Sequence, residues 1–116
     1  MPASVFEKLR SAEQLLGQVT AELDPDALDV EGAKKLVDLF TRCERLAVAG
    51  RSMAAGRVAK GVNWKQSGHR NSAEWLASAT GVSVGVAGRE LETARKLEEL
   101  PATAEAFRAG ELSEAQ

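Results

Sequence analysis

Cysteine and histidine are nearly absent from this 116-residue chain, which contains one of each, Cys43 and His69. A single cysteine excludes an intramolecular disulfide and any metal site built on several cysteines. A single histidine likewise excludes a hydrolase or nuclease centre built on several histidines within these residues. We expect Cys43 to be a small buried side chain and His69 to bind no metal. The sequence therefore indicates no metal, no cofactor and no catalytic residue, and we expect the chain not to be an enzyme.

Aromatic residues, prolines and long apolar runs are also scarce. The chain has no tyrosine, three phenylalanines, two tryptophans and three prolines. Alanine, leucine, glutamate and arginine dominate instead, which favours helices. No apolar run approaches the roughly 18 residues that span a bilayer, and the N-terminus lacks the apolar core of a signal peptide. These features predict a soluble, cytoplasmic, all-α protein of one compact domain overall.

Apolar residues recur at three- and four-residue spacing in two long segments, which predicts two amphipathic helices. The first covers residues 4–23 and ends at Asp24-Pro25-Asp26. The second begins near residues 29–31 and continues to about residue 60. Its predicted inner face consists of Leu36, Phe40, Cys43, Ala47, Gly50 and Ala54. Because the connection is short, we expect residues 1–60 to form a long antiparallel helical hairpin.

Residues 61–71 show no periodicity and predict a basic loop, whereas residues 72–116 predict a helix-turn-helix-like unit with short C-terminal helices. The expected helices cover about 72–79, 84–99 and 102–109, and a further one would begin at Ser113. Ala77, Gly81 and Ala87 have the spacing of a helix-turn-helix, in which the second helix presents its first turns to DNA. A tight helical corner with no DNA contact uses the same spacing and is the alternative.

Acidic residues are missing from one continuous stretch, although the net charge of the chain is only −2. Residues 1–44 carry five bases and nine acids, and residues 74–116 carry four bases and eight acids. Residues 45–73, here called the acid-free segment, carry six bases and no acid. Such a block favours contact with phosphates or with an acidic protein surface. The candidate nucleic-acid-binding residues are Arg51, Arg57, Lys60, Lys65, Arg70, Ser83 and Arg89.

Trp64, within the acid-free segment, has two interpretations. Its indole ring could stack on a base or on a partner. Alternatively, the ring folds back on the core of the protein.

Two stretches of the chain resemble a known family. The first is Gly68-His69-Arg70-Asn71-Ser72-Ala73-Glu74-Trp75-Leu76-Ala77 with Thr80-Gly81-Val82-Ser83, which is similar to the family's G-x-R-S-x-x-x-W-L-A and T-G-V-S segments. The second, residues 94–103 with residues 110–116, resembles its A-R-x-L-x-x-L-P-A-T and G-E-L-S-x-x-Q segments. The family is the actinobacterial domain of unknown function 222, and the resemblance covers residues from about 30 to 116.

This resemblance implies an accessory domain of an HNH endonuclease-like protein, since family members usually precede an HNH module. Any endonuclease activity would then belong to a C-terminal module that this sequence does not contain. Family members tend to carry several arginines after T-G-V-S, where this chain has Val84-Gly85-Val86-Ala87-Gly88. The resemblance transfers no catalytic residue to this chain.

Two functions remain open from the sequence. The first is a DNA-associated accessory domain that contacts phosphates through the acid-free segment. The alternative is a homodimerisation or protein-interaction module without nucleic-acid contact, which associates through the long second helix. In that alternative the acid-free segment pairs with the acidic residues 90–99 of a neighbour. Neither function involves a membrane or a small-molecule substrate.

Overall fold

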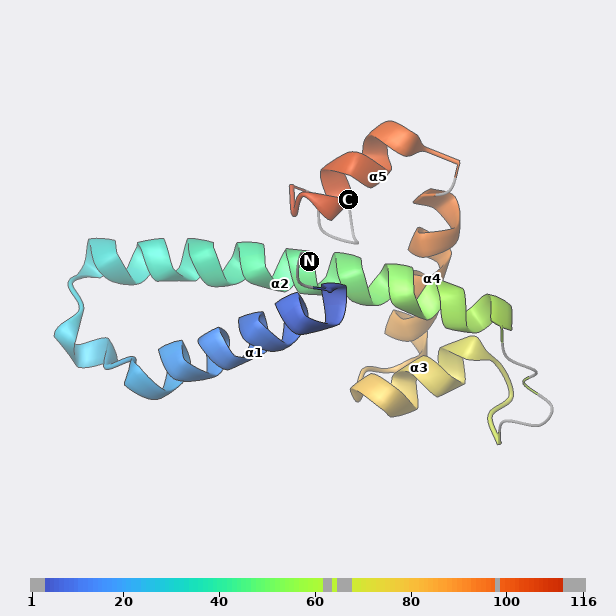
Figure 1. Cartoon of the computed structure of the whole chain (residues 1–116), viewed down its shortest axis with the longest axis horizontal. Coiled ribbons are helices and arrows are strands. Elements are labelled where there is room, and N and C mark those ends of the chain that lie inside the picture. Colours follow the sequence, from blue (N-terminus) through green and yellow to red (C-terminus); the bar gives the residue numbers. More distant parts are fainter. Residues whose placement is uncertain (1–3, 62–63, 65–67, 98, 112–116) are drawn as a thin grey trace. The chain divides into compact units, whose positions relative to one another are not determined.

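The structure is a computed structural model and describes residues 4–61, 64, 68–97 and 99–111. Every regular element among these residues is helical (Figure 1). The elements are α1 (Val5–Glu22), the 3-10 turn η1 (Pro25–Ala27), α2 (Val30–Gly61), α3 (Ser72–Thr80), α4 (Val84–Leu97) and α5 (Pro101–Arg108). The predictions of an all-α fold and of one long helix over about residues 30–60 are therefore confirmed. Within the described ranges, no helix is long and apolar enough to cross a membrane.

The chain divides into two compact units, residues 1–37 and residues 38–116, called unit 1 and unit 2 below. The boundary lies inside α2, whose helix continues without interruption through it. The antiparallel hairpin over residues 1–60 stays a prediction, as does the division of the chain at residues 61–71. The candidate functional residues all belong to unit 2.

Side-chain caps start the helices of unit 1. The Ser4 hydroxyl accepts a hydrogen bond from the Glu7 backbone N–H at 3.1 Å, at the start of α1. The Asp29 carboxylate does the same for the Gly32 N–H at 2.7 Å, at the start of α2. Such caps satisfy N–H groups that have no partner within the helix. α1 itself buries no residue, so its apolar side chains are exposed.

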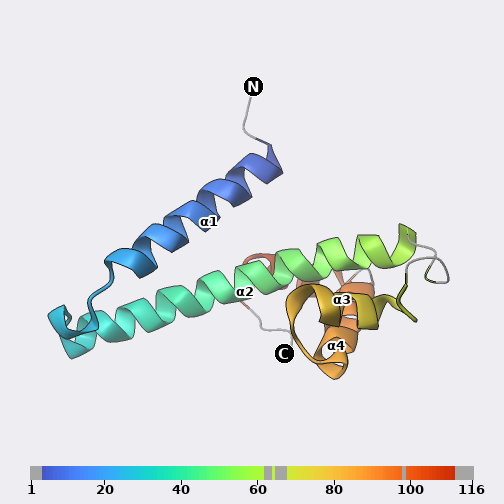
Figure 2. The ribbon, with the colours of Figure 1, turned by 90° about the horizontal axis from the view of Figure 1, so that it is seen from below.

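The core of unit 2 forms where α3 and α4 pack against the C-terminal half of α2 (Figures 1 and 2). One residue from each helix lies at its centre, namely Ala55 of α2, Leu76 of α3 and Ala87 of α4. Trp75 and Leu91 are partly buried against this cluster. Two of the three central residues are alanines, which allows the helices to approach closely.

The face of α2 that packs against α3 and α4 differs from the predicted face. The buried residues are Ala49, Ser52 and Ala55, whereas Cys43 is exposed and so are Ala47, Gly50 and Ala54. The expected burial of Cys43 is therefore wrong. In this part of α2 the predicted and the buried rows both consist of small residues, so their size could not show which row faces α3 and α4. Ser52 is fully buried, and its hydroxyl has no hydrogen-bond partner among the described residues, so its contribution to this face is its small volume.

α3 and α4 meet in a tight corner with the predicted helix-turn-helix spacing. Gly81 adopts a left-handed conformation with φ of 81°, and its N–H donates to the Ala77 carbonyl at 2.8 Å. Glycine adopts this conformation without the steric cost that a side chain imposes. Ala87, six residues after Gly81, is completely buried. The turn at Gly81 and the burial of Ala87 therefore agree with the predicted helix-turn-helix spacing.

The C-terminal part of unit 2 closes on α2 through α5. Phe107 is buried, and the chain turns at Gly110, where φ is 77°. A Cβ atom at Gly110 would lie 3.1 Å from the Leu46 side chain of α2, so this turn requires a small residue. The helix predicted to begin at Ser113 lies outside the described residues.

Candidate nucleic-acid interface

Arg51, the first candidate base, forms an ion pair with Glu90 of α4. Arg51 Nε donates to Glu90 Oε2 at 3.1 Å, and Nη2 donates to Oε1. The Glu90 side chain is 1% exposed, whereas that of Arg51 is 38% exposed. A planar guanidinium can make two parallel hydrogen bonds to one carboxylate, which fixes the relative orientation of the two groups. Arg51 thus links α2 to α4 and neutralises a buried acid.

Three other candidate bases flank the connection from α2 to α3. Arg57 and Lys60 lie on the last turns of α2, and both line a pocket together with the first two residues of α3. Arg70 comes two residues before α3. All three side chains are exposed, and we call them the basic corner. Arg70 Nε lies 3.8 Å from Glu74 Oε2, but a solvent-exposed pair of this kind contributes little and leaves the cation accessible.

The first turns of α4 offer fewer groups for base recognition. The Ser83 hydroxyl accepts a hydrogen bond from the Val86 N–H at 3.1 Å and so caps the helix. Arg89 is exposed and has no acidic partner among the residues that the structure describes. Arginine can contact guanine with two hydrogen bonds, but the residues between Ser83 and Arg89 are valine, glycine and alanine. This helix therefore suits phosphate contact better than sequence readout.

Trp64 lies against another aromatic ring. Its ring centroid is 6.2 Å from that of Trp75, and the two planes are inclined by 43°. This tilted geometry is typical of favourable aromatic pairs. Because Trp75 packs on the core, this contact supports the interpretation in which Trp64 folds back rather than stacking on a base. In the part of the chain that the structure describes, no three His, Cys, Asp or Glu side chains gather to hold a metal ion.

The structure thus leaves three candidates exposed, Arg57, Lys60 and Arg70, and links Arg51 to an acid instead. Lys65 lies outside the described residues. Glu90 is the partner that sequence reasoning missed, because it was considered only as part of the acidic residues 90–99 that would face a neighbouring chain. Its position three residues after Ala87 and next to Leu91 places it on the inner side of α4, where a carboxylate requires a base.

The fold and these residues define an all-α protein with a helix-turn-helix-like corner packed on a long helix and three exposed bases beside it. Residues 33–116 match the family described as Domain of unknown function (DUF222), so the chain belongs to this family. The predicted family is confirmed. No curated protein and no solved structure matches the chain significantly.

Proposed function

We propose that this chain is a non-catalytic helical accessory domain that associates with DNA through phosphate contacts. The observation that carries the proposal is the basic corner, in which Arg57, Lys60 and Arg70 are all exposed on either side of the connection from α2 to α3. Nonspecific DNA affinity comes mainly from such cations, because each neutralised phosphate releases condensed counterions. Arg89 adds a cation on α4, whereas Arg51 is better assigned to the fold than to DNA.

The resemblance described above supports the wider part of this proposal. According to this wider proposal, the chain assists an HNH endonuclease-like protein in the cytoplasm. Phosphodiester cleavage is then carried out by a separate module. The exposed bases then hold the nuclease on DNA without selecting a sequence.

Charge reversal at the basic corner tests the proposal. The triple variant Arg57→Glu, Lys60→Glu and Arg70→Glu should lose measurable binding to a random-sequence duplex at low salt. For the unmodified protein, three phosphate contacts predict that log K falls with log salt with a slope of about −2.7. Its affinity should therefore decrease about 40-fold between 50 and 200 mM salt. Fluorescence anisotropy of a labelled duplex measures both quantities.

The matched control reverses three exposed lysines of unit 1 with the same change in net charge: Lys8→Glu, Lys34→Glu and Lys35→Glu. This variant should retain most of the affinity if the contact is local. An equal loss in both triple variants would assign the effect to net charge alone. Absence of binding by the unmodified protein at low salt would exclude the DNA proposal.

A second candidate function, self-association through α2, is favoured by exposed apolar side chains. Val30 and Val37 of α2 lie seven residues apart, on the same side of the helix, and are 71% and 65% exposed. Large apolar side chains exposed together are typical of protein–protein contact surfaces. In this alternative the chain dimerises and the basic corner faces an acidic protein surface.

Sedimentation equilibrium over a concentration series checks this alternative. The unmodified chain should form dimers, and the double variant Val30→Asp and Val37→Asp should weaken dimerisation by about 100-fold or more, because each charge would be buried against apolar surface. Leu100→Asp, at an exposed leucine outside α2, serves as the control and should leave the dimer intact. A monomer at all concentrations would rule out self-association.

A further inference from the structure

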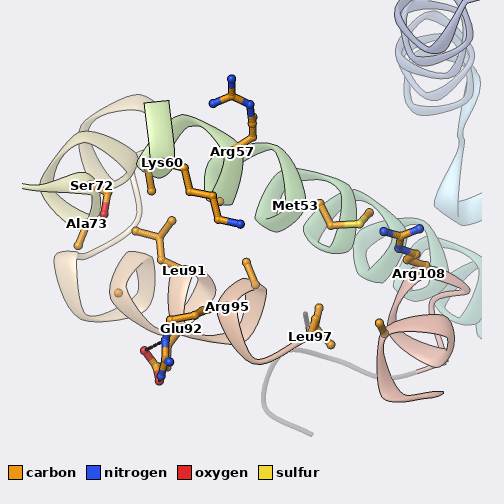
Figure 3. Close-up of a pocket in the computed structure, with 15 residues that line it drawn as sticks. Met53, Arg57, Lys60, Ser72, Ala73, Leu91, Glu92, Arg95, Leu97 and Arg108 are labelled. Carbon is orange, nitrogen blue, oxygen red and sulfur yellow. Dashed lines mark hydrogen bonds and ion pairs between the residues drawn. The ribbon is translucent and has the colours of Figure 1, made fainter. Parts of the chain in front are cut away.

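A pocket of about 570 Å³ lies between α2, α4 and α5 of unit 2 (Figure 3). α2 and α4 meet here over small residues, since a Cβ atom at Gly56 would lie 3.2 Å from the Ala94 Cβ. The larger apolar side chains of the lining are Met53 of α2 and Leu91 and Leu97 of α4. The volume is in the range of roughly 300–1,000 Å³ that is typical of small-molecule sites. An apolar group that entered this pocket would gain free energy from the surface it removes from water.

One base, Arg108 of α5, lies at the end of the pocket near Met53 (Figure 3). Its side chain is exposed and has no acidic partner among the residues that the structure describes. The preceding residue, Phe107, is 2% exposed, so burial of its ring holds the last turn of α5 in place beside the pocket. A guanidinium binds a carboxylate through two parallel hydrogen bonds. This end of the pocket can therefore hold one carboxylate.

The other charged side chains of the lining are engaged elsewhere. Lys60 makes an interaction of its own, and Arg57 extends away from α4 in Figure 3. Arg95 Nε donates to Glu92 Oε2 at 3.4 Å, and this hydrogen bond lowers the pKa of the Glu92 carboxyl. Glu92 thus stays ionised beside its own base and does not compete for Arg108. The lining matches a ligand with a single anionic group.

The composition of the lining argues against two classes of ligand. Unpaired nucleobases bind mainly by stacking on aromatic rings, and no aromatic residue lines this pocket. A phosphorylated compound carries about two negative charges at neutral pH, which exceeds the charge of one arginine. A flexible aliphatic chain, in contrast, can follow an irregular surface of methionine, leucine, alanine and glycine side chains.

We propose that this pocket binds a small aliphatic carboxylic acid. The carboxylate pairs with the guanidinium of Arg108, and the aliphatic chain lies along Met53, Leu91 and Leu97. Neither contact requires a residue of the basic corner, so the site is independent of the proposed DNA contact.

Three small molecules test the proposal against the full chain: octanoate, butyrate and octanol. Each methylene group that enters the pocket should tighten binding about fourfold, so octanoate should bind at least about tenfold more tightly than butyrate. Octanol keeps the long chain but lacks the carboxylate, and it should also bind about tenfold more weakly than octanoate. Nuclear magnetic resonance titrations measure the affinities, and shifts of the Met53, Leu91 and Leu97 methyl signals locate the site.

One pair of variants tests the apolar part of the site. Ala104→Leu should weaken octanoate binding by about tenfold, because Ala104 lines the pocket and the larger side chain occupies its volume. Ala102→Leu is the matched control, since Ala102 is an exposed residue of the same helix, α5, and does not line the pocket. Circular dichroism shows that each variant keeps its helices.

A second pair of variants tests the charged part. Arg108→Gln should weaken octanoate binding by about tenfold and leave octanol binding unchanged, because octanol has no charge for the arginine to attract. Lys96→Gln is the control, since Lys96 is an exposed base on the last turn of α4 and does not line the pocket.

Four results would overturn the proposal: no binding of octanoate, equal binding of octanoate and butyrate, equal losses in Ala104→Leu and Ala102→Leu, or an Arg108→Gln variant that binds octanoate as well as the unmodified protein does. All these variants leave the three bases of the basic corner unchanged. DNA affinity measured on the same proteins therefore separates a failure of this proposal from a failure of the DNA proposal.

Discussion

Replacement of Arg51 with alanine is expected to lower the free energy of unfolding by about 3–5 kcal/mol, the range observed when a buried charge loses its partner. The physical reason is the burial of Glu90, whose side chain is 1% exposed and accepts two hydrogen bonds from Arg51. Without the guanidinium, this carboxylate must remain unpaired, take up a proton or pull α4 away from α2. Urea unfolding followed by circular dichroism measures the loss.

Replacement of Glu90 should lower the free energy of unfolding less than replacement of Arg51. In Glu90→Leu, Arg51 loses this carboxylate, but its side chain is 38% exposed and can gain hydrogen bonds from water. The double variant Arg51→Met and Glu90→Leu should regain most of the stability, because apolar groups of similar volume can replace a buried ion pair. Arg51→Ala should therefore be the least stable of the three proteins.

Arg95→Ala is the matched control, since it removes an arginine from an exposed pair with Glu92. Exposed pairs contribute about 0.2–1 kcal/mol, so the loss should be several times smaller than in Arg51→Ala. Similar losses in Arg51→Ala and Arg95→Ala would show that the Arg51–Glu90 pair does not hold α2 and α4 together.

Leu76→Ala should destabilise unit 2 by about 2–5 kcal/mol, because it removes the largest side chain at the centre of the core. Leu76 is 2% exposed and contacts a cluster that contains Ala55 and Ala87. Both neighbours are alanines, so neither has a flexible side chain that can move into the space left behind. The cavity therefore persists, and the loss should lie toward the upper end of the range.

Thermal unfolding measures the destabilisation caused by Leu76→Ala. The midpoint temperature should decrease by about 4–8 °C for each kcal/mol of stability lost. Leu100→Ala provides the comparison, because Leu100 is 52% exposed at the start of α5. It should shift the midpoint by no more than a few degrees. If Leu76→Ala were tolerated as well as Leu100→Ala, α3 would not pack on α2 as described.

Local features of this fold follow directly from the sequence. The caps at Ser4 and Asn71, the left-handed glycine at Gly81 and the buried Ala87 each depend on residues only a few positions away. Helix ends and turns are governed by such short-range hydrogen bonds and steric effects. The predicted bounds of the helices therefore agree with the structure to within a few residues.

Features that depend on distant residues were predicted less well. The buried face of α2 is set by the packing of α3 and α4, which selects Ala49, Ser52 and Ala55 over the equally small Ala47, Gly50 and Ala54. The pairing of Arg51 joins residues 39 positions apart. Counting charges along the chain could locate the acid-free segment, but it could not show that an acid from α4 neutralises one of its bases.

The same distinction applies to the candidate interface. Arg57, Lys60 and Arg70 were identified because each lies within the acid-free segment. Their exposure, however, depends on how the helices around them pack, which a count of charges does not show. Glu90 was overlooked because an acid in a short helix is usually exposed, and only its helical position relative to Ala87 indicated otherwise.

The bidentate pair between Arg51 and Glu90 also constrains how the family can diverge. A change at position 51 alone strands an anion in the interior, and a change at position 90 alone removes the anchor of the arginine. Substitutions are thus tolerated mainly when both positions change together. The new pair is then either a base with an acid or two apolar residues. Across related sequences, residues 51 and 90 should covary although they are distant in the chain.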